Sequence, residues 1–484
     1  MRIEIAAATV AMLLLLAAAP ARAAPATFGE AGRQALAALV RLYYAGDGRW
    51  RECDRAACRK ANRDWGADSA TYTLHLRWRA AHDRRVVPLI AALVAASPRY
   101  PAPCTGLPCP SWSDVPAWDG VAAMREYQIG HDPQALAHAE AAYRFVERSK
   151  VFALGACPRI DFQMPGGIGN HLKTLETGAN LVKAALLLYR ATHERGYLET
   201  AVARYAAART YFLDPRVPLY TAYVFDDGVR CRQLPRRLFA SVNGDMIWNG
   251  IQLAHLTGQR RYAAQAIATA RAVDRYLSDP RGIFADLQAE NDVVEPLVEA
   301  MFDLASSEHQ RFARAWILRN AGAAVSARAA DGAFGRFFDG PQPRGAVSLW
   351  QSNGGVALEV AAAALDPAGA VSPADAWRGA VLAPLRTKAL PVTIVFRGSG
   401  IALTGTLGAR CCEAGHARLY VDGVETFNRS GIWQNKSMTG SVPQTLLFAW
   451  RWPVAGRHTI RIEPGTPNAK EGEAFISLDG YLTE

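Results

Sequence analysis

The sequence lacks the short motifs that identify several common enzyme classes. It contains no Gly-x-Ser-x-Gly elbow of a serine hydrolase and no His-Glu-x-x-His pair of a zinc protease. A glycine-rich segment, 166–169, precedes Lys173, but no strand is predicted before it and no Gly-Lys-Ser/Thr ends it. A phosphate-binding loop is therefore excluded. We expect no cofactor.

Long apolar segments are also missing. After the N-terminus, no stretch reaches the roughly 18 apolar residues that a membrane-spanning helix needs, so we expect no integral membrane segment. Residues 1–23 combine Arg2, a short apolar run and the small-residue site Ala21-Arg22-Ala23. This arrangement is typical of a signal peptide and predicts a secreted or periplasmic protein.

Cationic residues are numerous but not clustered. The net charge is +10, and the 54 Lys and Arg residues are spread along the chain. Because no nucleic-acid-binding motif accompanies them, we expect no nucleic-acid partner. A basic exported protein is the simplest interpretation, although attraction to an acidic polysaccharide is compatible with this charge.

Cysteine is the residue type that export makes most informative, because disulfides form in oxidising compartments. The eight cysteines are Cys53, Cys58, Cys104, Cys109, Cys157, Cys231, Cys411 and Cys412. The first two pairs could each close a short loop, Cys157 could meet Cys231, and the adjacent Cys411 and Cys412 could pair with each other or elsewhere. A spacing of five residues without a nearby histidine pair argues against zinc, so we expect no metal.

Residues 28–365 show a repeated helical pattern. Amphipathic runs come in pairs joined by short polar turns, roughly 50 to 65 residues apart, which is typical of tandem helical units. The turns are His82-Asp83, His131-Asp132, His193-Glu194, Thr257-Gly258 and Ser306-Ser307. With an opening and a closing helix, about twelve helices result. We predict that residues 28–366 form an all-α (α/α)6 toroid.

The connections alternate in length, which separates two faces of the predicted ring. Turns within a pair are tight, whereas connections between pairs are long and rich in Trp, Gly, Asn and acids. Antiparallel helices with this alternation place the long loops on one face, where the first helix of each pair begins. We expect functional residues on this long-loop face.

The composition changes after Asp366. Residues 367–388 read as a linker, and residues 389–484 alternate apolar and polar positions between Gly and Asp-Gly signals. The segment Val421-Asp422-Gly423-Val424 is a strong hairpin signal. We predict a small all-β sandwich after the helical domain, which makes the protein multidomain.

The repeats resemble those of six-hairpin glycosidases, and among them most closely glycoside hydrolase family 76, the endo-α-1,6-mannanase family. The segments that carry the resemblance are REYQIGHDPQALAHAEAAYRFV and LLLYRATHERGYLETAVARYAAARTYF. Lys173 falls where the family has a Lys-Asn pair, and Asn243-Gly244 is similar to its Tyr-Asn-Gln-Gly helix start. The C-terminal segments FRGSGIALTG, ARLYVDGVETF and AGRHTIRI resemble galactose-binding-like β-sandwich modules.

The stretch 111–120 is the best candidate for catalysis. The family uses two consecutive aspartates as nucleophile and acid/base, and the resemblance places Asp114 on the first and Val115 on the second. Because glycoside hydrolysis needs two carboxyl groups, we predict the catalytic pair Asp114 and Asp119. The acids Glu290, Asp292 and Glu295 are alternatives across the ring. A structural role is also open, with Asp114 as a helix cap and Asp119 as a first-turn acid.

Further polar and aromatic residues on the long-loop face are predicted to bind substrate. Aromatic faces stack on sugar rings, although burial within the ring is an equally common use of tryptophan. The predicted substrate-binding residues are Trp112, Trp118, Lys173, Glu176, Asn243, Asp245, Asp292 and Trp350.

Taken together, the patterns favour a secreted, monomeric glycoside hydrolase that cleaves an α-linked, α-1,6-mannan-like polysaccharide. Val115 supports a different class, a non-catalytic carbohydrate-binding protein on a degenerate hydrolase scaffold. A toroid-fold polysaccharide lyase is a third possibility. Its Tyr/His or Asn/His site is disfavoured because the histidines lie mainly in turns.

Overall fold

The computed structural model describes most of residues 27–484. The gaps are 56–57, 59–60, 63–64, 101, 286–292, 344, 372–376, 378–379, 388–389, 408–415, 429–431, 434–441 and 466–477. The predicted signal peptide, Cys411, Cys412, Glu290 and Asp292 therefore lie outside the described residues. In the described part of the chain, no helix has the length and hydropathy of a membrane span.

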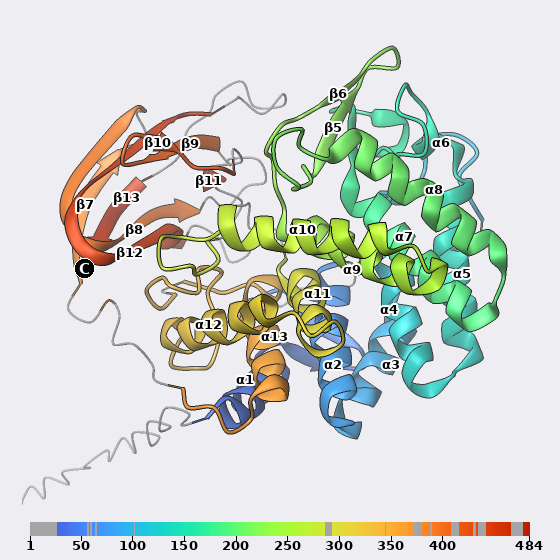
Figure 1. The fold of residues 1–484 in the computed structure, drawn as a ribbon, viewed down its shortest axis with the longest axis horizontal. Coiled ribbons are helices and arrows are strands. Elements are labelled where there is room, and N and C mark those ends of the chain that lie inside the picture. Colours follow the sequence, from blue (N-terminus) through green and yellow to red (C-terminus); the bar gives the residue numbers. More distant parts are fainter. Residues whose placement is uncertain are drawn as a thin grey trace, which may run out of the picture.

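The helices form a closed double ring, which confirms the predicted (α/α)6 toroid (Figure 1). The inner ring, in order of contact, consists of α2 (Trp65–Ala81), α4 (Asp114–Gly130), α7 (Leu175–Thr192), α9 (Ala240–Thr257), α11 (Glu295–Ser306) and α13 (Leu349–Leu365), and α13 returns to α2. The outer partners are α3 (Val87–Ala96), α5 (Pro133–Arg148), α8 (Arg195–Phe212), α10 (Arg260–Tyr276), α12 (Arg311–Ala327) and, beside α13, α1 (Phe28–Tyr43).

Residue patterns explain which helices lie inside. The outer helix α5 buries a stripe that includes Ala135, Ala139 and Ala142, with polar residues on its other side. The inner helix α9 is buried along its length from Ala240 to Leu253. A helix that is surrounded by neighbours on all sides needs small or apolar side chains over most of its surface. The remaining buried polar groups of such a helix need partners.

The short turns share one backbone device. His131, His193 and Gly258 each end an inner helix in the left-handed conformation, with φ of 51°, 60° and 70°. Each backbone N–H donates to the carbonyl four residues earlier, which closes the helix. Asp132 then caps α5, because its side chain accepts from the backbone N–H of Gln134. Local chemistry therefore sets these turns.

The long connections carry short strands and disulfides. The strands form two small sheets, β1 (Tyr44–Gly46), β2 (Arg49–Arg51) and β3 (Ala61–Asn62), and β4 (Leu172–Thr174), β5 (Tyr223–Asp226) and β6 (Cys231–Gln233). The short helix α6 (Lys150–Ala153) follows α5. Of the pairings that the cysteine spacing left open, the structure has Cys53–Cys58, Cys104–Cys109 and Cys157–Cys231. Each bridge fixes an irregular segment at the long-loop end of the ring.

The C-terminal strands form one bent antiparallel sheet in the order β10-β9-β12-β8-β13-β7, and β11 also pairs with β9. The strands are β7 (Val381–Thr387), β8 (Val392–Leu407), β9 (His416–Val421), β10 (Val424–Glu425), β11 (Ile432–Trp433), β12 (Val442–Pro464) and β13 (Leu478–Thr483). The ladder of β8 with β12 is interrupted between Arg451 and Gly456. Residues of both halves, such as Ile460 and Phe448, pack in one core, as expected for the predicted sandwich.

An ionic contact joins the sheet to the helical ring. The carboxylate of Asp339, in the connection after α12, accepts hydrogen bonds from Arg281 and from Arg451 of β12, with shortest distances of 2.8 and 2.9 Å. The backbone carbonyl of Asp339 accepts a bond from the indole of Trp377 at 3.0 Å. Asp279 lies beside this group and acts electrostatically on Asp339.

We expect the folded state to lose stability as pH rises through the pKa values of the two carboxyl groups at this contact. Burial raises the pKa of Asp279 to about 6, and burial together with Asp279 raises the pKa of Asp339 to about 7. Carboxyl groups that hold protons more tightly in the folded state stabilise it at acidic pH, and that stabilisation is lost as pH rises through 6–7. Denaturant unfolding at pH 5 and pH 8 should show this loss, and Asp279→Asn should reduce it. An unchanged pH dependence in the variant would contradict this assignment.

Candidate functional site

The first turns of four inner helices bring carboxylates to the long-loop end of the ring, here called the mouth. These residues are Asp68 of α2, Asp114 of α4, Glu176 of α7 and Glu295 of α11, each at most 9 % exposed. The Ser113 and Thr177 hydroxyls form a 2.7 Å hydrogen bond between α4 and α7. Ser241 of α9 donates to Glu176 at 2.9 Å. Three helix starts are thus held together by side chains.

Asp114 is the first residue of α4 and follows the N-cap residue Ser113. Its carboxylate accepts hydrogen bonds from the Gln163 side-chain amide at 3.2 Å and from the Val115 backbone N–H at 3.1 Å. A helix N-terminus stabilises the ionised form of such a carboxylate. The structure therefore places Asp114 where an anionic group is favoured.

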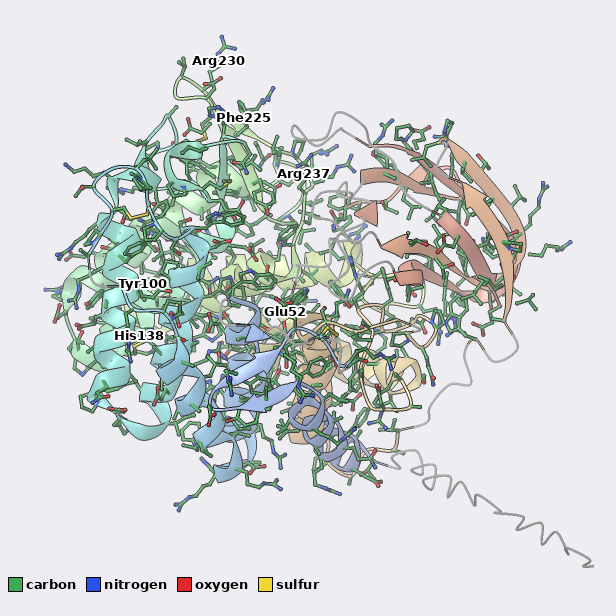
Figure 2. All side chains as sticks on the ribbon, turned by 180° about the vertical axis from the view of Figure 1, so that it is seen from behind. Glu52, Tyr100, His138, Phe225, Arg230 and Arg237 are labelled. Carbon is green, nitrogen blue, oxygen red and sulfur yellow. A yellow bond between two sulfur atoms is a disulfide. The ribbon has the colours of Figure 1, made fainter. Side chains whose placement is uncertain are left out.

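Asp119 has different surroundings. Its carboxylate is 1 % exposed, accepts a hydrogen bond from the Tyr100 hydroxyl at 2.9 Å, and lies 3.3 Å from His138 Nε2 of the outer helix α5. Figure 2 shows Tyr100 and His138 on the same side of the ring. Asp119 therefore contacts the outer layer of the ring, whereas Asp114 is held by Gln163 at the mouth.

The three predicted tryptophans lie in three different settings. Trp112 is 49 % exposed, just before α4. The Trp118 side chain is buried inside the toroid, and its indole centroid lies 5.5 Å from the centroid of the Tyr72 ring. Trp350, at the start of α13, packs against Trp65 of α2 at 5.3 Å. Only Trp112 therefore presents a broad aromatic surface to solvent.

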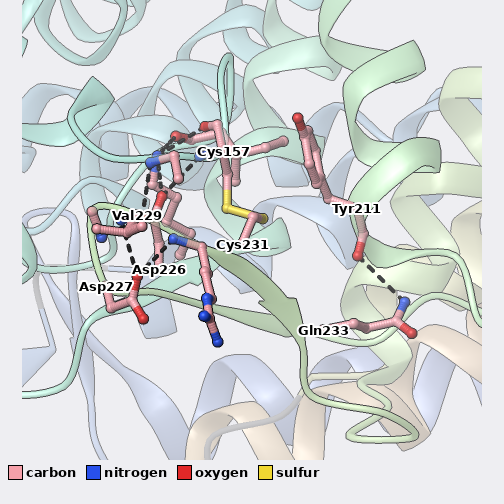
Figure 3. The surroundings of a disulfide bond; sticks show 12 residues. Cys157, Tyr211, Asp226, Asp227, Val229, Cys231 and Gln233 are labelled. Atoms are coloured by element: carbon pink, nitrogen blue, oxygen red, sulfur yellow. Dashed lines mark hydrogen bonds and ion pairs between the residues drawn. A yellow bond between two sulfur atoms is a disulfide. The ribbon is translucent and has the colours of Figure 1, made fainter.

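Lys173 is fully buried beside the Cys157–Cys231 disulfide. Its ammonium donates to the carbonyls of Cys157 and Ile160 at 2.9 and 2.8 Å and forms an ion pair with Asp226 at 3.2 Å. Asp226 also accepts from the backbone N–H groups of Ala156 and Cys157 (Figure 3). This group joins the loop after α6 to the β4-β5-β6 sheet, a contact that sequence spacing does not indicate.

The two predicted residues of α9 point to different partners. The Asn243 amide donates to the carbonyls of Tyr220 and Phe239 and accepts from the Tyr220 N–H, which fixes the segment before α9. Asp245, two residues further along α9, forms an ion pair with Lys183 at 2.6 Å. Asp292 lies outside the described residues.

A buried charge network occupies the centre of the ring. Glu299 of α11 forms ion pairs of 2.9 Å with both Arg125 of α4 and Lys183 of α7. The Arg125 guanidinium lies 3.5 Å from the centroid of the Tyr72 ring. Burial alone would raise the pKa of Glu299, but Arg125 and Lys183 outweigh it and hold the pKa well below its usual range. Glu299 is therefore ionised at neutral pH.

Beyond this network, a cavity of about 650 Å³ opens at the opposite end of the ring, among the middle and C-terminal turns of five inner helices. We call it the short-turn cavity. Its lining includes His75, Trp78, Arg79, Arg125, Tyr127, Lys183, Arg190, Trp248, Gln252, Glu299 and Asp303. Within the described ranges, no group of His, Cys, Asp and Glu is arranged to hold a metal.

Sequence reasoning missed this cavity, although a signal for it exists. Polar or aromatic residues recur three or four positions apart late in several inner helices. Examples are His75 and Arg79, Trp248 and Gln252, and Glu299 and Asp303. Such spacing puts both residues of a pair on one helix face. Because these helices belong to the inner ring, that face lies toward the ring axis.

Comparisons with known proteins identify the fold. No family model matches the chain, and no curated protein matches it. Among solved structures, the α-1,6-mannanase GH76A of Salegentibacter sp. HEL1_6 aligns with a TM-score of 0.58 at 19% identity over 70% of this chain and 99% of that chain. A glycoside hydrolase family 76 α-mannanase of Bacteroides thetaiotaomicron gives 0.59 at 15% identity, over 70% and 95%.

A variant of the Salegentibacter mannanase shows the same fold. It has two consecutive aspartates replaced by alanine, is described as inactive, and was solved with α-1,6-mannotetrose. It aligns with a TM-score of 0.59 at 19% identity, over 70% of this chain and all of that chain. The helical part of this protein therefore has the toroid fold of the family 76 glycoside hydrolases.

Proposed function

We propose that the protein is an exported glycoside hydrolase that cleaves an α-linked, α-1,6-mannan-like polysaccharide at the mouth of its ring. One observation carries the proposal: buried carboxylates lie in the first turns of four inner helices, at one end of a toroid fold that is also found in mannanases. Hydrolysis of a glycosidic bond needs two such groups on opposite sides of the bond. The predicted signal peptide and the three disulfides support export.

Asp114 is proposed as the first catalytic carboxylate. Its position at a helix start favours the ionised form, which suits a nucleophile or a base. The second carboxylate is proposed to be Asp119, as the sequence indicates, or Glu176. The contact between Ser113 and Thr177 supports Glu176, because these hydroxyls belong to the chain neighbours of Asp114 and Glu176. The activities of the Glu176→Gln and Asp119→Asn variants decide between the two.

The proposal is tested with the purified mature protein on a panel of glycans. We expect new reducing ends from α-1,6-mannan and none from β-1,4-mannan, because the site is proposed to recognise the α linkage. Cleavage of neither glycan, nor of any other α-linked polysaccharide in the panel, would overturn the hydrolase proposal. Reducing-end release over time, with chromatography of the products, is the measurement.

Carbohydrate binding without catalysis is the second candidate. One observation favours it: Val115 stands where the family resemblance expects the second of two consecutive aspartates. The same panel separates the two functions, because a binding protein would retain α-1,6-manno-oligosaccharides in calorimetry without cleaving them.

A further inference from the structure

The short-turn cavity has one positive charge more than its neighbouring carboxylates balance. The cations of its wall are Arg79, Arg125, Lys183 and Arg190. The carboxylates are Glu299 and Asp303 in the wall and Asp245 behind Lys183. Each of the first three cations is ion-paired with a carboxylate at 2.9 Å or less. Arg190 is the cation that remains.

Arg190 lies at the cavity rim in the last turn of α7 and is exposed. Asp303 attracts it electrostatically, but among the described residues no carboxylate is close enough to form an ion pair with it. A helix C-terminus favours a basic residue even without a ligand. That effect does not explain the rest of the wall, because Arg125 and Lys183 lie more than a turn inside their helices.

The wall also has the groups that hold a sugar ring. The indoles of Trp78 of α2 and Trp248 of α9 line the wall, with His75 stacked on Trp78 and the Lys183 ammonium over Trp248. Aromatic rings of this kind stack on sugar rings. Gln252 Oε1 and His75 Nδ1 are buried and have no hydrogen-bond partner among the described residues. Buried polar atoms without a protein partner usually bind water or a ligand. A cavity of about 650 Å³ is within the usual range for small-ligand sites.

We infer that the short-turn cavity is a second saccharide site, which takes a sugar unit with a single carboxylate, a uronic acid. The carboxylate would pair with Arg190, and the ring would lie against Trp78 or Trp248 while its hydroxyls meet Gln252 and His75. A single negative charge matches the one cation left unpaired. A phosphate dianion carries two negative charges, one more than Arg190 neutralises. The carboxylates of Glu299 and Asp303 would repel the second charge.

This site is separate from the proposed catalytic mouth. The cavity is lined from the middle and C-terminal turns of the inner helices, whereas the mouth carboxylates Asp114 and Glu176 lie in first turns. The charge network around Glu299 lies between the two ends. Binding at the cavity can therefore be measured whether or not the mouth cleaves mannan.

The test compares matched ligands by calorimetry on the full chain. We expect methyl α-glucuronoside or methyl α-galacturonoside to bind at least about tenfold more tightly than the corresponding neutral glycoside, since one charge-assisted pair distinguishes them. Glucose 6-phosphate should bind no more tightly than the uronide. Equal affinity for uronide and neutral glycoside in both pairs, or no binding of either uronide at millimolar concentration, would overturn the inference.

Two variants locate the binding. Arg190→Gln should abolish the preference for the uronide, whereas Arg195→Gln should keep it. Arg195 is a matched control, because it is also exposed on the short-turn face but does not line the cavity. Preference that survives Arg190→Gln would contradict the assignment. Any mannan hydrolysis should be the same in Arg190→Gln as in the wild type, and Asp114→Asn should bind uronide normally, so the two proposals fail separately.

Discussion

Replacing Asp114 by asparagine is expected to reduce mannan hydrolysis by about 10³-fold or more, because an amide can act neither as a nucleophile nor as a base. The fold should be kept. Val115 and Gln163 donate to different oxygens of Asp114, and asparagine keeps one of these acceptors, so at most one of the two hydrogen bonds is lost. Reducing-end release at saturating mannan, together with circular dichroism and unfolding curves, measures both quantities.

Matched variants identify the second carboxylate. Glu176→Gln and Asp119→Asn each remove one charge, and the one that acts in catalysis should lose activity as steeply as Asp114→Asn. If Asp119 only supports the fold, Asp119→Asn should instead lower the free energy of unfolding by about 1–3 kcal/mol through its contacts with Tyr100 and His138, with activity preserved. Full activity in Asp114→Asn would refute the proposed site.

The largest expected effect on stability comes from Glu299→Gln. This change removes the negative charge that Arg125 and Lys183 share at 2.9 Å and leaves Asp245 as the carboxylate paired with Lys183. Removing one partner from a buried ion pair costs about 3–5 kcal/mol, because the remaining charge stays in a site without water. We expect the free energy of unfolding to fall by about that amount.

Denaturant unfolding at pH 7 measures this loss, and Glu308→Gln is the control. Glu308 pairs with His255 at 2.8 Å near the rim, where the partly exposed pair is worth about 1 kcal/mol or less. The low pKa of Glu299 adds a pH criterion. Because its carboxyl stays ionised in the folded state, its contribution persists at neutral pH and is lost only under strongly acidic conditions. Similar losses in the two variants would contradict the central role of Glu299.

The helical repeat was predictable because its causes are local. The short turns follow from residues such as His131, Gly258 and Asp132, whose backbone conformation and capping bonds depend on near neighbours. Cys53 and Cys58 are close enough along the chain to find each other in most folds. When such helix pairs follow one another and the last helix packs beside the first, they form a closed ring.

The direction of side chains within an inner helix was not predictable. Asp114 and Asp119 are five positions apart, which separates them by about 140° around a helix. Helical periodicity distinguishes buried from exposed faces, but an inner helix of a double ring is buried on all sides. The sequence therefore does not tell whether Asp119 points to the ring axis or to α5, and only the packing of His138 beside it decides.

By itself, the sequence determined the toroid, its paired helices and a second β domain, since these depend on periodicity, turn chemistry and spacing. It left the disulfide pairing open, and the structure decided it. Tertiary structure alone decided that Lys173 pairs with Asp226, that six inner helices enclose the Glu299 charge network, and that the open cavity lies at the short-turn end. The physical reason is that each of these features joins residues from separate helices or loops. A local sequence pattern does not indicate such contacts, because they form only when the ring closes.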